Sequence, residues 1–387
     1  MYRMILPLLL LLLATCAADP AALEREISAI KADFAPDRRT DRVEVTVKNG
    51  QLQGYVTHPD AAARLREAAA TYPELKMAVR VLPDTAVGVQ TAGLVNVSVA
   101  NLRSKPGHSQ ELATQALLGT PLEVLDLRDG WYLVRTPDRY LAWLEPGAFV
   151  RMSPQEALAW LDSDLRRYGK TSGLLTVSPG GSRIVSDLVA GNLLQSTGRA
   201  ENSQVEVRLP DGTSGWVPAA DLTDYRGWQR PPGLDPDQLL ATAATLAGRP
   251  YFWGGTSPKG MDCSGFTKTA FYLNGYVIPR DASQQVHAGT PVELTDDLAN
   301  LQRGDLLFFG RYREDGSERI THVGFYLGAG RFLHSGADNG RIAENSLLPG
   351  DVLFAEHRRK SLLRVQRLGG GTEGVLPVEQ AFGALLE

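Results

Sequence analysis

The sequence predicts an α+β protein made of several domains, and three observations carry that prediction. Its 387 residues suit about two or three domains of ordinary size. The middle of the chain has short strand patterns with turn residues at intervals of about 8–12 residues, which favours small β-barrels. The last third combines a helical pattern that begins near Cys263 with several apolar strands. Hydrophobic residues make up 43% and charged residues 22%, as in ordinary folded proteins.

Charge and cysteine content exclude two classes of protein. There are 40 basic and 44 acidic residues, for a net charge of −4, so the chain lacks the positive charge that nucleic-acid binding requires. The two cysteines, Cys16 and Cys263, are too few for a scaffold held by several disulfide bonds. We therefore expect neither a nucleic-acid partner nor a disulfide framework.

Residues 1–18 have the pattern of an export signal. Arg3 precedes an apolar run over residues 4–14, which is too short to cross a bilayer as a helix, and small residues follow it. Residues 13–16 (LATC) also resemble a lipoprotein signal, in which Cys16 would carry a lipid, although Thr15 departs from the small residue expected there. Both processing routes stay open. We expect an exported protein of the periplasm or cell envelope, which contacts a membrane only through a lipid on Cys16.

Residues 19–90 predict a small α/β region. Apolar residues follow a helical spacing from Leu23 to Phe34. Asn49 and Gly50 form a strong hairpin signal between two strand patterns. The expected elements are helices over residues 19–34 and 60–71 and strands over residues 42–46, 51–56 and 77–82.

Two β-rich modules follow, over residues 91–152 and 171–229, with a helical linker over residues 153–170. A strand, a Pro-Asp turn and a strand with a tryptophan occur at Trp143 and again 73 residues later at Trp216. The first module resembles a bacterial SH3-like domain, and the second resembles it less closely. One larger β-domain with accidental internal similarity is the alternative. The motifs of the first module are NLR at 101–103, GTP at 119–121 and GWY at 130–132.

The last domain is expected over residues 233–368, after a stiff Arg-Pro-Pro-Gly linker, and a glycine-rich stretch opens a C-terminal tail over residues 369–387. Within it, a helix is expected to begin at Cys263, which has no disulfide partner once the export signal is processed. A helix start favours the thiolate and supplies N–H donors for an oxyanion. Because Asp262 and Ser264 flank it, Cys263 is a candidate nucleophile rather than an inert core thiol.

Two histidines are expected to face the same way. A hairpin centred near Ala329 pairs residue 322 with 336 and residue 324 with 334, which places His322 and His334 on one face of the sheet. Diagonal neighbours of this kind lie about 7–8 Å apart. A cysteine nucleophile needs a base, and the base needs an orienting group. A zinc site made by the same three residues is the chemical alternative, but the sequence has no other zinc motif, and we expect no cofactor.

At this point the last domain resembles the NlpC-type cell-wall cysteine peptidases. The resemblance covers the whole domain and rests on DCSGF at 262–266, RGDL at 303–306, HVG at 322–324 and HS at 334–335. It implies a papain-like α+β fold and a Cys-His-His triad. Cys263 would be the nucleophile, His322 the general base and His334 its orienting partner. Tyr251 would lie near the oxyanion.

The domain order resembles one subgroup, the γ-D-glutamyl-L-diamino acid endopeptidases, also called dipeptidyl-peptidase VI. It implies cleavage between D-Glu and the diamino acid of peptidoglycan stem peptides that have a free N-terminal L-Ala. A free amine needs acidic and hydroxyl partners, and the first SH3-like module would close the pocket. The residues implied in substrate binding are Asp262, Ser264, Glu111, Tyr140, Asp281, Ser283 and Trp253.

Two other functions stay open at this point. One is a hydrolase that uses its SH3-like modules as anchors and cuts intact peptidoglycan stems or cross-links. The other is a non-catalytic wall-binding protein with a degenerate peptidase domain. Glu111 and Tyr140 also have simpler interpretations, as a solvated loop acid and a core tyrosine of the β-module.

Overall fold

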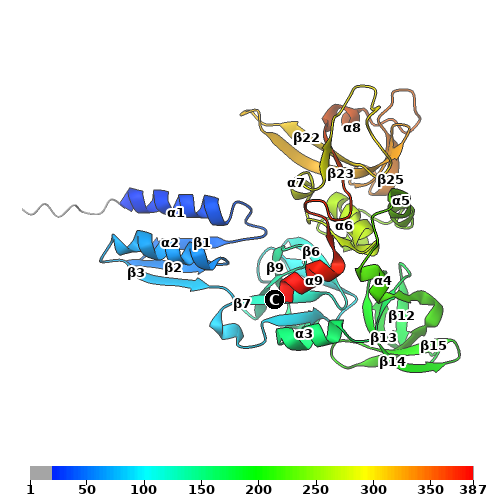
Figure 1. Ribbon diagram of the computed structural model, residues 1–387, viewed down its shortest axis with the longest axis horizontal. Coiled ribbons are helices and arrows are strands. Elements are labelled where there is room, and N and C mark those ends of the chain that lie inside the picture. The colour runs from blue at the N-terminus through cyan, green and yellow to red at the C-terminus, as the bar shows by residue number, and fades with distance from the viewer. Residues whose placement is uncertain (1–19, 387) are drawn as a thin grey trace, which may run out of the picture. The chain divides into compact units, whose positions relative to one another are not determined.

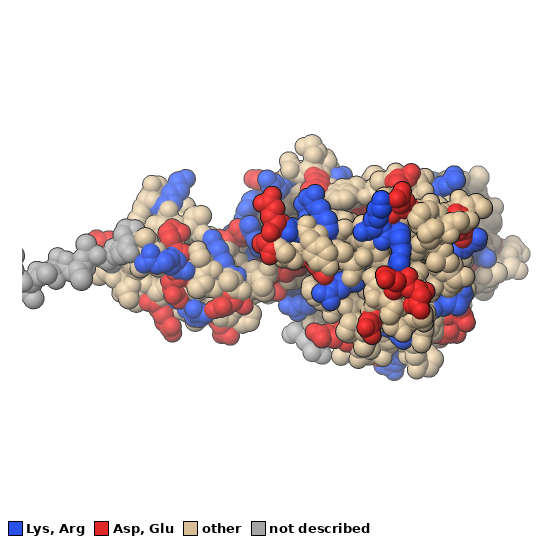
Figure 2. Space-filling view, turned by 90° about the horizontal axis from the view of Figure 1, so that it is seen from above, with Lys and Arg blue, Asp and Glu red and all other residues tan. Residues whose placement is uncertain are grey.

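The computed structural model describes residues 20–386, which form two compact units that divide between Leu82 and Pro83. The predicted export signal and Cys16 lie outside the described residues. None of the helices within residues 20–386 is long and apolar enough to cross a membrane. Basic and acidic side chains are interspersed on the face of the molecule that Figure 2 shows.

The first unit is a three-stranded sheet with two helices packed on it (Figure 1). Strands β1 and β2 form the predicted hairpin, in which Asn49 and Gly50 both adopt positive φ angles, as a two-residue hairpin turn requires. Strand β3 pairs with β2 in parallel. The elements are α1 (Pro20–Phe34), β1 (Val43–Lys48), β2 (Gln51–Val56), α2 (Pro59–Ala70) and β3 (Lys76–Val81).

The second unit begins with two separate seven-stranded antiparallel sheets, so the strands do not form one larger β-domain. The repeated motif forms the same hairpin in each sheet. Trp143 lies opposite Leu133 in the first, and Trp216 lies opposite Glu206 in the second. The strands of the first sheet are β4 (Ala92–Val95), β5 (Val99–Arg103), β6 (Leu112–Leu117), β7 (Pro121–Arg128), β8 (Trp131–Arg135), β9 (Leu141–Leu144) and β10 (Phe149–Met152). Those of the second are β11 (Leu165–Tyr168), β12 (Gly173–Thr176), β13 (Ile184–Leu188), β14 (Leu193–Glu201), β15 (Gln204–Arg208), β16 (Ser214–Pro218) and β17 (Leu222–Asp224).

The segment between the two sheets is only half helical, so the prediction of a helical linker over residues 153–170 was wrong in its second part. Helix α3 (Pro154–Leu161) begins with a capping box formed by Ser153 and Glu156. Strand β11 follows, because Leu165 and Tyr168 are buried and the backbone between them pairs with β14 and β17.

The last part of the chain packs helix α6 (Cys263–Leu273) against an antiparallel six-stranded sheet in the order β21-β26-β22-β23-β24-β25. Phe266 and Ala270 of the helix share one core with Phe325 and Leu333 of the sheet. This arrangement confirms the predicted α+β class. The sheet strands are β21 (Thr290–Val292), β22 (Leu306–Tyr312), β23 (Glu318–Gly328), β24 (Arg331–Gly336), β25 (Arg341–Ser346) and β26 (Leu362–Arg367). The remaining helices are α4 (Tyr225–Gln229), α5 (Pro236–Ala244), α7 (Ala282–Gln285) and α8 (Glu356–Ser361).

The C-terminal segment is structured. Strand β27 (Leu376–Pro377) pairs with β20 (Tyr276–Val277), and helix α9 (Val378–Leu386) follows it. Phe382 of α9 packs in a core with Ala92 of the first sheet, Leu161 of α3 and Val277. The end of the chain therefore joins three parts of the second unit (Figure 1).

Candidate active site

Helix α6 begins at Cys263 because Asp262 caps it. The Asp262 Oδ1 atom accepts a hydrogen bond from the backbone N–H of Gly265 at 2.7 Å, which satisfies a donor that the first helical turn leaves unpaired. The backbone N–H groups of Val323 on β23 and of Ser264 act on the Cys263 thiol and favour a lower pKa for it. The thiol therefore lies between the start of a helix and the strand that carries His322.

The two histidines meet in the predicted way. Strands β23 and β24 pair Phe325 with Leu333 and Tyr326 with Phe332, which is the register expected for the hairpin. His322 Nε2 lies 2.8 Å from His334 Nδ1, and the two rings are nearly perpendicular, at 85°. The predicted register and the shared face are thus confirmed, although a β-bulge between Tyr326 and Gly328 shifts the register next to the turn, where Gly328 pairs with Arg331.

A third residue, Asn345 of β25, fixes the tautomers of both histidines. Its amide nitrogen donates to the Leu353 carbonyl at 3.2 Å, so its oxygen faces His334 Nε2 at 2.8 Å and accepts a hydrogen bond from that nitrogen. His334 Nδ1 is then an acceptor, and His322 Nε2 donates to it. In the neutral pair, His322 Nδ1 carries no proton and is the basic nitrogen. Sequence reasoning missed Asn345, because nothing near it in the chain marks it as a partner of His334.

Burial disfavours the charged forms of Cys263, His322 and His334. Burial, reinforced by the charge of Arg358, lowers the pKa of His322 well below 6.5, and burial lowers the pKa of His334 to about 4. Burial and the Asp262 carboxylate raise the pKa of the Cys263 thiol to about 12, against the opposing N–H donors of Val323 and Ser264. Desolvation therefore acts against the thiolate that the helix start favours, and it also acts against the protonated forms of the two histidines.

We expect the activity to persist well into acid. A base must be unprotonated, and the pKa of His322 lies below its usual value, so kcat/KM should fall only below pH 6.5 as the pH decreases. The measurement is kcat/KM from pH 4 to pH 9. An acid limb centred at or above pH 6.5 would contradict the buried neutral pair.

The same pKa shifts also predict that the protein becomes less stable in acid, so the pH profile of kcat/KM needs a control for unfolding. The unfolded chain binds protons on both histidines near pH 6.5, whereas folded His334 binds its proton only near pH 4. The free energy of unfolding should therefore decrease as the pH falls from 6.5 to about 4. A melting curve at each pH separates lost activity from lost fold.

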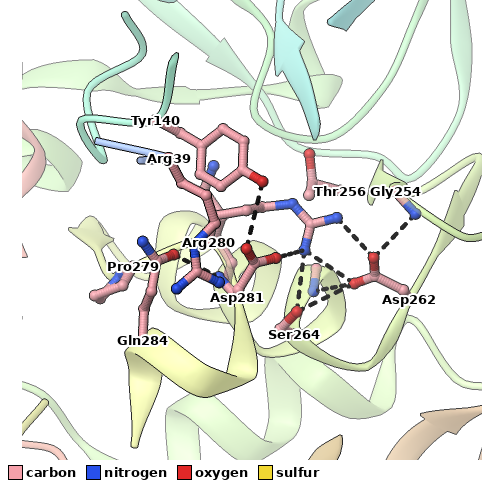
Figure 3. Close-up of polar contacts among 12 residues, drawn as sticks. Arg39, Tyr140, Gly254, Thr256, Asp262, Ser264, Pro279, Arg280, Asp281 and Gln284 are labelled. Carbon is pink, nitrogen blue, oxygen red and sulfur yellow. Dashed lines mark hydrogen bonds and ion pairs between the residues drawn. The ribbon is translucent and has the colours of Figure 1, made fainter. Parts of the chain in front are cut away.

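Asp262 is held in a buried ion pair with Arg280 (Figure 3). Arg280 is 1% exposed, and its two terminal nitrogens lie 3.1 Å and 2.6 Å from the two carboxylate oxygens of Asp262. Gly254, Ser264 and Gly265 also donate to the carboxylate, which thus accepts five hydrogen bonds. Asp262 has no spare acceptor position for an ammonium group, and its charge is balanced. Sequence reasoning missed Arg280, although it adjoins Asp281, which the sequence analysis assigns to substrate binding.

The first SH3-like module reaches the candidate site through two side chains. Trp253 Nε1 donates to Glu111 Oε1 at 2.8 Å. The Tyr140 hydroxyl donates to Asp281 Oδ2 at 3.3 Å (Figure 3). Trp253 is 63% exposed, whereas Tyr140 is buried in the barrel. Both simpler interpretations of these residues are thus incomplete, because each contacts a residue of the last domain that lies near Cys263 in the sequence or the fold.

Further contacts hold the first SH3-like module against the last domain. Gln115 of β6 and Thr256 exchange three hydrogen bonds of 2.9–3.2 Å. Lys268 of α6 forms a largely buried ion pair with Asp138 at 2.8 Å. Because Lys268 lies on the helix that begins with Cys263, the first module is positioned directly against the helix that carries the thiol.

The remaining predicted residues lie in the same region. Ser264 accepts a hydrogen bond from Arg280 Nη1 at 3.0 Å, and Ser283 lies in α7, whose N-cap is Asp281. Tyr251 interacts electrostatically with Cys263, and burial, with that thiol, raises its pKa to about 12, so its hydroxyl keeps its proton. His334 engages both ring nitrogens in hydrogen bonds. Within residues 20–386, no group of three or more His, Cys, Asp or Glu side chains is arranged to hold a metal ion.

Comparison with known proteins identifies two domains. The NlpC/P60 family matches residues 248–349, which contain Cys263, His322 and His334. The bacterial dipeptidyl-peptidase SH3 domain matches residues 102–149, which contain Glu111 and Tyr140. A crystal structure of an NlpC/P60 family protein from Bacillus cereus ATCC 10987 is similar to the fold, with a TM-score of 0.60 and 24% identity over 71% of this chain and 99% of that one.

Curated relatives extend over both domains. The gamma-D-glutamyl-L-lysine dipeptidyl-peptidase of Bacillus cereus is 32% identical over 236 residues, which cover 59% of this chain and 68% of that protein. Dipeptidyl-peptidase 6 of Lysinibacillus sphaericus is 28% identical over 66% of this chain and 91% of its own length. The Bacillus subtilis gamma-D-glutamyl-L-lysine dipeptidyl-peptidase is 48% identical, but over only 31% of its length. The chain therefore belongs to the NlpC/P60 family, and an SH3 domain of the bacterial dipeptidyl-peptidase type precedes its family domain.

Proposed function

We propose that this NlpC/P60 family protein is a cysteine endopeptidase that hydrolyses the γ-D-glutamyl–diamino acid bond of peptidoglycan stem peptides with a free N-terminal L-Ala. The names of its relatives support a cell-wall peptidase that acts at γ-D-glutamyl bonds. The observation that carries the finer proposal is the contact of the SH3-like module with the site, through Glu111 and Tyr140.

The chemistry follows from the neutral resting pair. As the Cys263 sulfur attacks the γ-carbonyl carbon of D-Glu, the thiol proton moves to His322 Nδ1, and His334 stabilises the imidazolium through its hydrogen bond. The oxyanion lies toward the N–H groups at the start of α6 and the protonated hydroxyl of Tyr251.

The second half of the reaction returns the thiol. The C–N bond breaks, and His322 gives its proton to the leaving nitrogen of the diamino acid. The thioester that remains is hydrolysed by water, whose proton His322 accepts and whose oxygen enters the new γ-carboxylate. The breakdown of this second tetrahedral intermediate releases the sulfur, which regains its proton from His322.

The acyl end of the substrate meets acidic side chains in this proposal. The carboxylates of Glu111 and Asp281 contact Trp253 and Tyr140, and the Asp262 carboxylate pairs with Arg280. We assign the ammonium group of the substrate to the exposed carboxylate of Glu111, because Asp262 already accepts five hydrogen bonds. Ser264, Ser283 and Trp253 complete this pocket in the proposal. Tyr140 limits its length.

The proposed enzyme is exported. Residues 1–18 carry the signal pattern, which supports this part of the proposal. Cleavage before Cys16 with lipid attachment and cleavage near Ala18 give mature chains of different mass, which the intact mass of the processed protein distinguishes.

We expect free L-Ala-γ-D-Glu-diamino acid to be cut about 10⁴-fold more efficiently than its N-acetylated form. Acetylation removes the ammonium charge, deprives the proposed carboxylate partners of that charge and adds bulk against Tyr140. Each lost charge-assisted hydrogen bond costs about 1.5–3 kcal/mol. The measurement is kcat/KM for both tripeptides. Glu111→Gln and Tyr140→Phe should narrow the ratio.

Glu145→Gln is the matched control, because it removes an acid of the same module that lies near His108 instead. Equal cleavage of the two tripeptides by the wild type would favour an anchored hydrolase that cuts intact stems. Binding to peptidoglycan without cleavage of any peptide would favour a wall-binding protein.

A further inference from the structure

A charged cluster of Asp338, His357 and Arg358 borders the histidine side of the site. Asp338 Oδ2 accepts hydrogen bonds from His357 Nε2 at 3.0 Å and from Arg358 Nη2 and Nε at 2.9 Å and 3.2 Å. Arg358 lies in α8, and Asp338 lies in the loop after β24. The proposed reaction uses none of these three side chains.

The cluster is tied to both histidines. The Arg358 guanidinium lies 5.7 Å from the centre of the Phe309 ring, and that ring lies 5.6 Å from the ring of His322. A β-carbon placed at Gly336 would collide with the Asp338 carboxylate and with the second histidine ring, so these two groups meet over the glycine. The cluster therefore lies beside the base and its partner.

This position is where the leaving group of the reaction must be. His322 takes the thiol proton and gives it to the leaving nitrogen, so that nitrogen lies within hydrogen-bond reach of the imidazole. The acyl part of the substrate extends to Glu111 and Asp281. The diamino acid then extends from the leaving nitrogen along the histidine side, past Arg358.

Arg358 has the properties of a carboxylate receptor. Its side chain is 14% exposed, so it reaches solvent while most of it is fixed by packing. Asp338 engages Nε and Nη2, whereas Nη1 has no hydrogen-bond partner within residues 20–386. A guanidinium that one acid holds in place loses little entropy when a second carboxylate binds to its remaining nitrogen.

We propose that Arg358 forms a subsite for a carboxylate of the leaving diamino acid. The inference rests on the proposed function. Two carboxylates qualify by chemistry. One is the α-carboxylate of a diamino acid at the C-terminus of the peptide, and the other is the side-chain carboxylate of diaminopimelate, which lysine lacks.

Four tripeptides test the subsite and distinguish the two sources. They are L-Ala-γ-D-Glu followed by diaminopimelate or lysine, each with a free or amidated α-carboxylate. One charge-assisted hydrogen bond is worth about 10- to 100-fold in kcat/KM. We expect Arg358→Gln to lower kcat/KM by this factor for peptides that carry the recognised carboxylate. For the tripeptide that ends in lysine α-amide, which has neither carboxylate, the same substitution should lower kcat/KM much less.

When different substrates are compared within one variant, the effect of the substitution on His322 cancels. Because Arg358 also lowers the pKa of His322, Arg358→Gln changes the rate for every substrate, but a ratio between substrates cancels that change. Lys360→Gln is the matched control, since Lys360 lies on the same short helix, pairs with Glu356 and is 74% exposed.

The possible outcomes distinguish a failure of the Arg358 subsite from a failure of the proposed function. A loss confined to free α-carboxylates assigns the subsite to the C-terminus, and a loss confined to diaminopimelate assigns it to the side chain. An equal loss on all four peptides overturns the subsite and leaves the proposed function intact. If the wild type cuts none of the four, the proposed function fails, and the subsite fails with it.

Discussion

Replacement of Cys263 by alanine is expected to abolish peptide hydrolysis and to leave the fold unchanged. The thiol is the only strong nucleophile in the constellation, and Cys263 is the only cysteine within the described residues. The removal of a nucleophile from a unit of this kind costs on the order of 10⁶ in kcat. The measurement is kcat on the free tripeptide, with a melting curve as the control for the fold.

Three further experiments sharpen this result. Cys263→Ser keeps the size of the side chain but should be equally inactive, because a buried hydroxyl beside a neutral imidazole is a much weaker nucleophile. Iodoacetamide should inactivate the wild type at a rate that rises with pH, since the pKa of the thiol is raised. Chelators should have no effect. Loss of activity with EDTA that zinc restores would instead establish a metal site.

Substitution of the two histidines is expected to have unequal effects. His322→Ala should lower kcat by several orders of magnitude, because every proton transfer of the proposed reaction passes through its Nδ1 atom. His334→Ala should cost less, because His334 holds the tautomer and stabilises the imidazolium but carries no proton to substrate. The measurement is kcat for each variant on the free tripeptide.

Two variants complete this comparison. Asn345→Ala should resemble His334→Ala in direction, because it removes the acceptor that fixes the tautomer. His287→Ala is the matched control, since His287 is exposed and lies outside the hairpin of the two histidines. Equal tolerance of His322→Ala and His334→Ala would contradict the assignment of base and partner.

The geometry of the histidine pair could be predicted from sequence because it depends on local rules. The turn near Ala329 has positive φ angles at three consecutive positions, 328, 329 and 330, which two glycines make accessible. The turn and the β-bulge next to it, between Tyr326 and Gly328, set the register, and the register fixes which side chains share a face. The helix that begins at Cys263 followed in the same way from an N-cap and an apolar face.

The charge state of the site could not be predicted, because it depends on burial that no local pattern encodes. The helix start favours a thiolate, whereas burial and the Asp262 carboxylate raise the pKa of the thiol to about 12. The pairing of Asp262 with Arg280 is also a tertiary event, since 18 residues separate the two in the sequence. For the same reason, the partners of Glu111 and Tyr140 emerged only from the fold.

Helix α9 affects where the protein can be divided into separate domains. Its apolar face fills a core to which the first SH3-like module, α3 and the NlpC/P60 domain all contribute, with Phe382 at 2% exposure. Removal of the helix would open that core on three sides at once. The domain limits that sequence families draw therefore cut through a shared core. We expect the catalytic domain to lose stability when it is separated from the rest of residues 83–386.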